Sequence, residues 1–428
     1  MNFIDKAMSS ALGRQASLLL VFAFLLLLPF RRLFELPLSL MALLGLIILL
    51  SQRTTLWQRP GIRLFSMIFA AFWLPMLLSL IGAINPERSV NTIAAFFRLY
   101  LAGIFIIITI NSAEKSENLL RLSAWVLLIW VADALLQIAV GYNSLGYTAP
   151  GGRINGFFGE LRPELGVHLP VLAPLLLFYA HRFWPKLGQL LLLAAVALVV
   201  FMSGSRNGWI MFTMVFAGLA AWMIWQDRQR ALRWIALAAI LMTATLTGTY
   251  FLSSTFAGKV NHSLRAFSGD LESFDAATSR RVPIWQTASR MFIDNPINGV
   301  GARGFRYAYR SYAADPENDP FLSEPDSLGA YQPHLTLLEI GAETGIIGLA
   351  GFAGAWGMLI MVWWRAGPSQ RQEFFPYILA VAVVFFPLNS HHALYASDWS
   401  AVCFWLTALF CAAAGYTARP DHRSSWIC

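Results

Sequence analysis

Two apolar runs joined by a short polar turn decide the architecture of this chain. Residues 187–201 read LGQLLLLAAVALVVF and residues 209–225 read WIMFTMVFAGLAAWMIW, and the turn between them contains Ser203-Gly204-Ser205-Arg206-Asn207-Gly208. A bilayer core requires about 20 apolar residues per helix, and a slightly shorter run can still cross it. The stretch therefore predicts two membrane-spanning helices, with Arg206 held at the membrane surface between them.

The same pattern extends over most of the 428 residues, of which 57% are hydrophobic and 13% charged. It predicts an all-α polytopic membrane protein with about 12 transmembrane helices, at residues 16–30, 35–50, 64–83, 91–111, 119–140, 164–181, 187–203, 207–225, 234–252, 335–363, 374–389 and 398–417. Residues 253–333 form the one long polar stretch, which leaves no material for a separate soluble domain. We expect residues 1–428 to form a single membrane domain in which 253–333 is a loop with short helices.

Lys and Arg in the short loops predict the orientation, because cytoplasmic loops carry an excess of both. With a cytoplasmic N-terminus, the inner side carries sixteen: Lys6, Arg14, Arg53, Arg59, Arg63, Lys115, Arg121, Arg182, Lys186, Arg228, Arg230, Arg233, Arg365, Arg371, Arg419 and Arg423. The outer short loops carry six: Arg31, Arg32, Arg88, Arg153, Arg162 and Arg206. Both termini are therefore predicted inside and the long loop outside. The net charge of +8 then meets anionic membrane lipids and gives no reason to expect nucleic acid as a partner.

No metal site, disulfide framework or cofactor is expected on the outer face. Cys403 and Cys411 lie in the last predicted span and Cys428 is terminal, so the long loop contains no cysteine. The stretch Gly299-Val300-Gly301-Ala302-Arg303-Gly304 has the spacing G-x-G-x-x-G, but no strand–helix–strand unit surrounds it. We interpret it as a tight turn that brings backbone close to the membrane surface.

Four arginines near the outer ends of spans require a physical reason, because a guanidinium is costly at bilayer depth. They are Arg153, Arg162, Arg206 and Arg281. A lone arginine at such a position often snorkels to lipid phosphates. The small, glycine-rich residues around Arg206 leave room for a ligand against the backbone, and this favours anion binding.

The long loop contains an amphipathic segment at residues 278–294, with apolar residues at helical spacing. We expect Thr278 or Ser279 to cap this helix, Pro283 to lie in its first turn and Asp294 to end it.

Arg280 and Arg281 then stand at the helix start, where a cation opposes the helix dipole by about 0.3 to 1 kcal/mol. Two cations placed there have two explanations. Either an anion lies between them, or they pair with the carboxylates of Glu272 and Asp275 just upstream.

His334 follows Pro333 and directly precedes the apolar run 335–363. This placement holds an imidazole at the outer membrane surface, at a helix start rather than in a long loop. A histidine at such a position is by default a capping or interfacial residue. The outward arginines favour a catalytic role, because an imidazole titrates near neutral pH.

Fixed cations, one imidazole and a lipid-facing surface together suit transfer of a group from a lipid phosphate or diphosphate. A diphosphate is a good leaving group, so no strong general acid is required. The arginines would hold the donor and stabilise the leaving charge, while His334 would take the proton from an acceptor hydroxyl.

Several pieces of sequence, in this order, resemble the O-antigen ligase and Wzy polymerase superfamily, specifically its O-antigen ligase branch. They are Ser203 to Arg206, Arg281 to Trp285, Asn295 to Gly301, and His334 followed by Glu343, Gly345 and Gly348. An earlier stretch is also similar and contains Asp133, Gln137, Gly141, Gly146, Arg153 and Gly156. The resemblance covers roughly residues 90–390. One difference is Leu335, since the family commonly has Asn after the histidine.

The resemblance implies a GT-C-like bundle and an inverting, metal-independent glycosyltransferase. The implied partners are an undecaprenyl-diphosphate-linked O-antigen as donor and a lipid A-core sugar hydroxyl as acceptor, at the periplasmic face of the bacterial inner membrane. By the same resemblance Arg206 and Arg281, with Arg280, would bind the donor diphosphate, and His334 would activate or position the acceptor. Arg153 and Arg162 are further candidates for the phosphates of either substrate.

Two other functions stay open from the sequence. A Wzy-type polymerase or a pilin oligosaccharyltransferase would use the same donor, and the single long outer loop favours the ligase, since polymerases are expected to carry two. A transporter would place ionisable groups near the bilayer midplane and often shows inverted repeats. The main mid-span polar residues are Arg98, Asp133 and Gln137, which are too few for a transport path.

Overall fold

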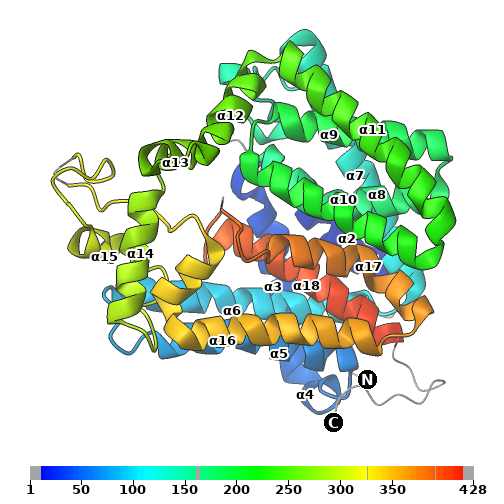
Figure 1. Ribbon diagram of the computed structural model, residues 1–428. Helices are drawn as coiled ribbons and strands as arrows, with labels where there is room; N and C mark the ends of the chain where they lie inside the picture. The colour runs from blue at the N-terminus through cyan, green and yellow to red at the C-terminus, as the bar shows by residue number, and fades with distance from the viewer. Residues whose placement is uncertain (1–10, 161–163, 325, 391, 418–428) are drawn as a thin grey trace. The chain divides into compact units, whose positions relative to one another are not determined.

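The computed structural model describes residues 11–160, 164–324, 326–390 and 392–417, and every regular element in these ranges is a helix (Figure 1). Each of the twelve predicted spans falls on one helix. These are α2 (Ala11–Leu27), α3 (Glu35–Ser51), α5 (Pro60–Leu78), α6 (Pro86–Thr109), α7 (Ala113–Val140), α8 (Leu165–Phe183), α9 (Lys186–Met202), α10 (Arg206–Gln226), α11 (Arg228–Leu252), α16 (Thr336–Arg365), α17 (Pro368–Val384) and α18 (Ser397–Thr417).

These runs are helical because lipid cannot hydrogen-bond the backbone, so an apolar segment must satisfy its own N–H and C=O groups. Nine helices of the described part are long and apolar enough to cross a membrane. Three more, α2, α9 and α17, have 17 residues each. The chain is therefore a polytopic helical membrane protein.

The remaining elements are short. They are the helices α4 (Arg53–Leu56), α12 (Ser254–Leu264), α13 (Leu271–Ala277), α14 (Val282–Asp294) and α15 (Phe305–Tyr312), and the 3-10 turns η1 (Arg31–Phe34), η2 (Pro150–Gly152), η3 (Gly156–Phe158) and η4 (Arg265–Phe267). Four of these helices, α12 to α15, lie in the stretch 253–333, as predicted for the long polar segment.

The chain divides into two compact units. Unit 1 comprises residues 1–37, 112–264 and 375–384, and unit 2 comprises residues 38–111, 265–374 and 385–428. The long polar stretch is shared between them, since α12 belongs to unit 1 whereas η4 and α13 to α15 belong to unit 2.

In unit 1, α8 packs against α7, α9 and α10. Two glycines allow the start of α8 and the start of α10 to meet at backbone distance. A Cβ on Gly208 would lie 1.7 Å from the carbonyl oxygen of Gly166, so no larger residue fits without a shift. This close approach fixes the polar turn between α9 and α10 against the first turn of α8.

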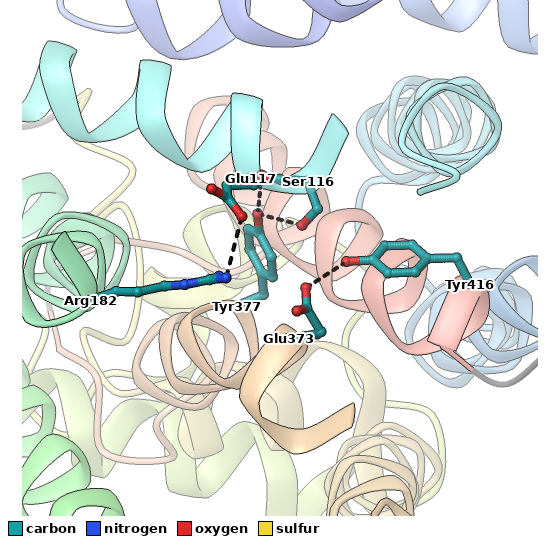
Figure 2. A network of polar contacts seen from close by, with 6 residues as sticks. All are labelled: Ser116, Glu117, Arg182, Glu373, Tyr377 and Tyr416. Atoms are coloured by element: carbon teal, nitrogen blue, oxygen red, sulfur yellow. Dashed lines mark hydrogen bonds and ion pairs between the residues drawn. The ribbon is translucent and has the colours of Figure 1, made fainter. Parts of the chain in front are cut away.

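A polar network joins α7, α8 and α17 where α7 begins (Figure 2). The Arg182 guanidinium lies 3.4 Å from the Glu117 carboxylate, and the Tyr377 hydroxyl is 3.0 Å from Ser116 Oγ. The arginine at this end of α8 therefore has a carboxylate partner. In unit 2, the Tyr416 hydroxyl donates to Glu373 at 3.3 Å.

Unit 2 is built around α5, α6, α16 and α18, in which α18 packs against α5 and α6 and α16 packs against α5. Aromatic rings fill the space between α5, α6 and α18. The Phe404 ring meets Phe69 and Phe96 edge-on, at centroid distances of 5.4 and 5.1 Å. Edge-to-face packing of this kind adds about 0.5–1.5 kcal/mol per pair beyond area burial.

The amphipathic helix α14 begins later than the sequence predicts. The helix starts at Val282 with Arg281 at its N-cap, so the prediction that Thr278 or Ser279 caps it is wrong. The chain turns first, because Ser279 and Arg280 both adopt left-handed backbone angles. The Asp275 carboxylate then accepts a 2.8 Å hydrogen bond from the Val282 N–H and serves the helix start in their place. Pro283 in the first turn and Asp294 at the end agree with the prediction.

Candidate functional site

The loop after α7 is held by a buried glutamine. Gln137, with 1% of its surface exposed, donates from Nε2 to the carbonyl oxygens of Tyr147 and Thr148, both at 3.0 Å. Its Oε1 accepts from the backbone N–H groups of Asn155 and Gly156 at 3.0 and 2.9 Å. All four hydrogen bonds of the amide are therefore spent on one loop, which fixes its conformation.

Asp133, one turn earlier on α7, supports the same loop. One of its carboxylate oxygens accepts from the backbone N–H of Ser144 at 2.9 Å and from the Ser144 hydroxyl at 2.5 Å, and the other accepts from Asn143 Nδ2 at 3.2 Å. The two buried polar residues of α7 thus have a structural explanation. They order the segment that carries Arg153.

This loop docks onto the turn between α9 and α10. The Ile154 N–H donates to the Met202 carbonyl at 3.2 Å, which places Arg153 directly beside the stretch Ser203 to Arg206. The turn itself relies on Gly204, whose φ of +67° favours glycine. Ser205 then caps α10, since its Oγ accepts from the Gly208 N–H at 3.3 Å.

Helix α12 is the third segment that contacts the loop and the turn. Thr255 Oγ1 donates to the Gly151 carbonyl at 3.0 Å, and the Lys259 ammonium donates to the Gly204 carbonyl. Arg206 Nη1 donates to Ser263 Oγ at 3.3 Å. Arg153, Arg206 and Lys259 are therefore brought together from three separate segments of unit 1, and we call these three residues the cation cluster.

The electrostatics of the cluster are unfavourable without an anion. Burial, followed by the nearby positive charges of Arg153 and Arg206, lowers the pKa of Lys259 to about 8. Desolvation and like charge both disfavour the ammonium form. A bound phosphate or diphosphate removes this penalty, so the cluster is suited to hold one.

Arg280 and Arg281 lie in unit 2, at the start of α14. Arg280 is exposed with a φ of +57°, and its N–H donates to the Asp275 carbonyl at 2.7 Å. Arg281 is half-buried at the N-cap. The Asp275 side chain accepts from the backbone of Val282, which is a capping role.

His334 lies just before α16, also in unit 2. Its φ of +51° places it in the left-handed region, which is uncommon for a residue with a side chain, and Gln332 Nε2 lies 3.1 Å from its Nδ1. The first turn of α16 is anchored by Thr336, whose N–H donates to the Asn389 carbonyl at 3.0 Å. The His334 imidazole is thus half-buried at an anchored helix start, and the Gln332 amide lies beside its Nδ1 atom.

The scaffold behind His334 contains two buried glutamates. Glu339 accepts from the Leu394 N–H at 2.9 Å and from the Tyr395 N–H at 3.3 Å. Glu343, with 1% of its surface exposed, accepts from the Arg303 N–H at 2.7 Å. Both carboxylates bind the backbone of neighbouring loops, which is a structural use.

The glycine-rich turn at residues 299–304 is formed as predicted, and its close approach is to α16. The N–H groups of Val300 and Gly301 donate to the carbonyls of Ala342 and Glu343 at 2.8 and 3.1 Å. α16 is interrupted at Gly345, where φ is +63° and a Cβ would strike the backbone of Ile297. Gly345, one of the residues that resemble the family, therefore forms the interruption of α16 against which this turn packs.

The structure brings two of the sequence candidates, Arg153 and Arg206, together in unit 1, and places Arg280 and Arg281 as neighbours in unit 2. Arg162 lies outside the described residues. Two functional candidates were missed, Lys259 and Gln332. Lys259 had a signal, because Thr255, Lys259 and Ser263 recur every four residues on one helical face.

Within the described ranges, no group of three or more His, Cys, Asp or Glu residues is placed to hold a metal ion. The site chemistry available there consists of cations, an imidazole and backbone groups.

Comparison with known families accounts for this arrangement. The family model described as O-antigen ligase (Wzy_C) matches residues 190–353. The chain carries an O-antigen ligase domain. This match supports membership of the O-antigen ligase and Wzy polymerase superfamily. The matched residues of the O-antigen ligase domain run from within α9 to within α16 and include Arg206, Lys259, Arg281 and His334. A search of curated proteins found no match to the chain.

Proposed function

We propose that this protein is a lipopolysaccharide O-antigen ligase, a metal-independent membrane glycosyltransferase. It transfers a glycan from undecaprenyl diphosphate to a sugar hydroxyl of the lipid A-core, at the periplasmic face of the bacterial inner membrane. The observation that carries the proposal is the cation cluster, in which Arg206 and Lys259 lie within the residues matched by the O-antigen ligase model. Three cations held together by backbone docking fit a lipid-linked diphosphate.

The proposed reaction is a single displacement. The acceptor hydroxyl oxygen attacks the anomeric carbon, the bond from that carbon to the diphosphate oxygen breaks, and the anomeric configuration inverts. His334 takes the hydroxyl proton, and the diphosphate leaves with its charge stabilised by arginine. Arg206, assisted by Arg153, supplies this stabilisation in unit 1, and Arg280 and Arg281 supply cations at the start of α14.

The proposed topology has twelve membrane-spanning helices in one GT-C-like membrane domain. Both termini face the cytoplasm, and residues 253–333 face the periplasm. The excess of lysine and arginine in the short loops on the side of the N-terminus supports this orientation. A labelling scan of single cysteines in a variant lacking Cys403, Cys411 and Cys428 tests this arrangement.

The nearest alternative is a Wzy-type polymerase or a pilin oligosaccharyltransferase, which would use the same donor on another acceptor. The experiment that separates them is a gel profile of lipopolysaccharide from a deletion strain. A ligase deletion removes all long-chain lipopolysaccharide while polymerised lipid-linked glycan accumulates. A polymerase deletion leaves lipopolysaccharide with a single repeat, and an unchanged profile contradicts both assignments.

A further inference from the structure

One face of α12 contacts the region around Arg206. Thr255, Lys259 and Ser263 follow one another at intervals of four residues, so their side chains project from the same side of the helix. Each reaches a different part of the site: Gly151 in the loop, Gly204 in the turn, and the Arg206 guanidinium. α12 is therefore fitted to the site and is more than a connector after α11.

Of the three residues on this face, Lys259 is the charged one. Its burial and the nearby arginines disfavour its positive charge. The charged groups that face it are Arg153 from the loop and Arg206 from α10, both cations. Among the described residues, its ammonium donates to the neutral Gly204 carbonyl, which uses one of the three N–H donors of an ammonium. The remaining donors are available to an anion that Arg153 and Arg206 also attract.

We propose that Lys259 is a further ligand of the donor diphosphate, and that it couples donor binding to the position of α12 by keeping its contact with Gly204. This inference rests on the proposed function, because it takes the lipid-linked diphosphate as the anion. It adds a lysine from α12, in unit 1, to a proposed donor site whose other cations are arginines.

The proposal has a definite pH dependence. The pKa of Lys259 is lowered to about 8 in the free protein, and a bound diphosphate stabilises the ammonium and raises that pKa. The contribution of Lys259 to affinity is thus fully present below about pH 8 and is lost as pH rises above it. A phosphate group loses its second proton near pH 6, so the ligand charge stays constant over this range.

The test measures binding of undecaprenyl diphosphate to the purified full-length protein in detergent at pH 7 and at pH 9.5. Lys259→Met should bind about 10- to 100-fold more weakly than wild type at pH 7, the usual range for losing a charge-assisted hydrogen bond, and should show little further loss at pH 9.5. Lys259→Arg should retain binding at pH 9.5, because a guanidinium stays protonated. Lys186→Met, which removes a lysine from the start of α9, is the matched control and should bind as wild type does.

Wild-type affinity and pH dependence in Lys259→Met would overturn the inference while leaving the ligase proposal intact. Failure of the wild-type protein itself to bind undecaprenyl diphosphate would instead overturn the proposed function. Equal displacement by phosphatidylglycerol would show that the cluster holds lipid headgroups and would also overturn the assignment of Lys259 to the donor. If Lys259→Met does not purify as a folded protein, the comparison of wild type with Lys259→Arg at pH 9.5 tests the inference. Lys259→Arg should then bind more tightly than wild type, and equal binding would overturn the inference.

Discussion

The cation cluster and the start of α16 hold their side chains in opposite ways. In the cluster, three cations from distant segments lie close together, with Lys259 donating to the Gly204 carbonyl and Arg206 to the Ser263 hydroxyl. At the start of α16, one imidazole stands on a left-handed backbone beside an amide, on a helix anchored through Thr336. The first region concentrates charge, and the second fixes an orientation.

The proposed function assigns different work to these two regions. Concentrated positive charge favours binding of an anion and stabilisation of leaving charge, whereas a fixed imidazole favours proton transfer. Changes in the cluster should therefore alter donor affinity, while changes at His334 should alter the rate with donor binding retained.

The largest effect is expected for His334→Ala. Removing a general base lowers a rate by about 100- to 10,000-fold, so glycan transfer in proteoliposomes should fall by this factor while undecaprenyl diphosphate still binds. His181→Ala, at the end of α8, is the control and should transfer normally. Near-normal turnover, or loss of donor binding, in His334→Ala would move His334 from base to scaffold and remove the proposed division of work.

Arg206→Ala and Arg281→Ala should each reduce transfer by about 100- to 1,000-fold, because each removes a fixed cation that stabilises the leaving diphosphate. The lysine variants should also fail if the guanidinium binds two phosphate oxygens at once, since an ammonium is a point charge. Arg230→Ala removes an exposed arginine paired with Asp227 and should leave transfer unchanged. Full activity in both alanine variants would end the assignment of these arginines to the donor.

Gln332→Ala should cost about tenfold in transfer rate, because the Gln332 amide donates from Nε2 to His334 Nδ1 at 3.1 Å and so holds the orientation of the imidazole. Gln332→Glu should move the acidic limb of the pH–rate profile to higher pH, since a carboxylate stabilises the imidazolium. Measuring the full profile separates this role from a packing role, which would lower the rate without moving the limb. An unshifted limb in Gln332→Glu would contradict the proposed role of Gln332 beside the His334 imidazole.

The thermal stability of the ligand-free protein should rise between about pH 7.5 and pH 9.5. Below about pH 8 Lys259 is charged in both the folded and the unfolded chain, and the folded state carries the burial penalty. Above that pH the folded chain releases the proton while the unfolded chain keeps it, so folding gains. Scanning fluorimetry of wild type against Lys259→Met checks this, and identical slopes in the two proteins would contradict it.

The smallest expected effect is that of chelation. Transfer by the purified enzyme should survive EDTA, because the proposed chemistry uses cations and an imidazole in place of a metal. Recovery of a chelated, inactive enzyme on addition of magnesium or manganese alone would disprove this. Asp315, Glu317 and Asp319 in the long polar stretch would then be the first residues to substitute.

The sequence by itself determined the helices and the placement of two candidate site residues at helix starts. An apolar run of about 20 residues in lipid can satisfy its backbone only as a helix, so every predicted span corresponds to a helix. The positions of Arg206 and His334 at the starts of helices were equally readable, because a polar turn or a proline next to an apolar run is a local signal.

Only the tertiary structure decided which of these residues meet. Arg153, Arg206 and Lys259 are far apart in sequence, and they are joined by the docking of Ile154 on Met202 and of α12 on Gly204. Hydrophobic periodicity records which face of a helix is apolar and holds no information on such contacts. The same reason explains why Gln137 and Asp133 looked like isolated mid-span polar residues, when packing makes them the support of the loop that carries Arg153.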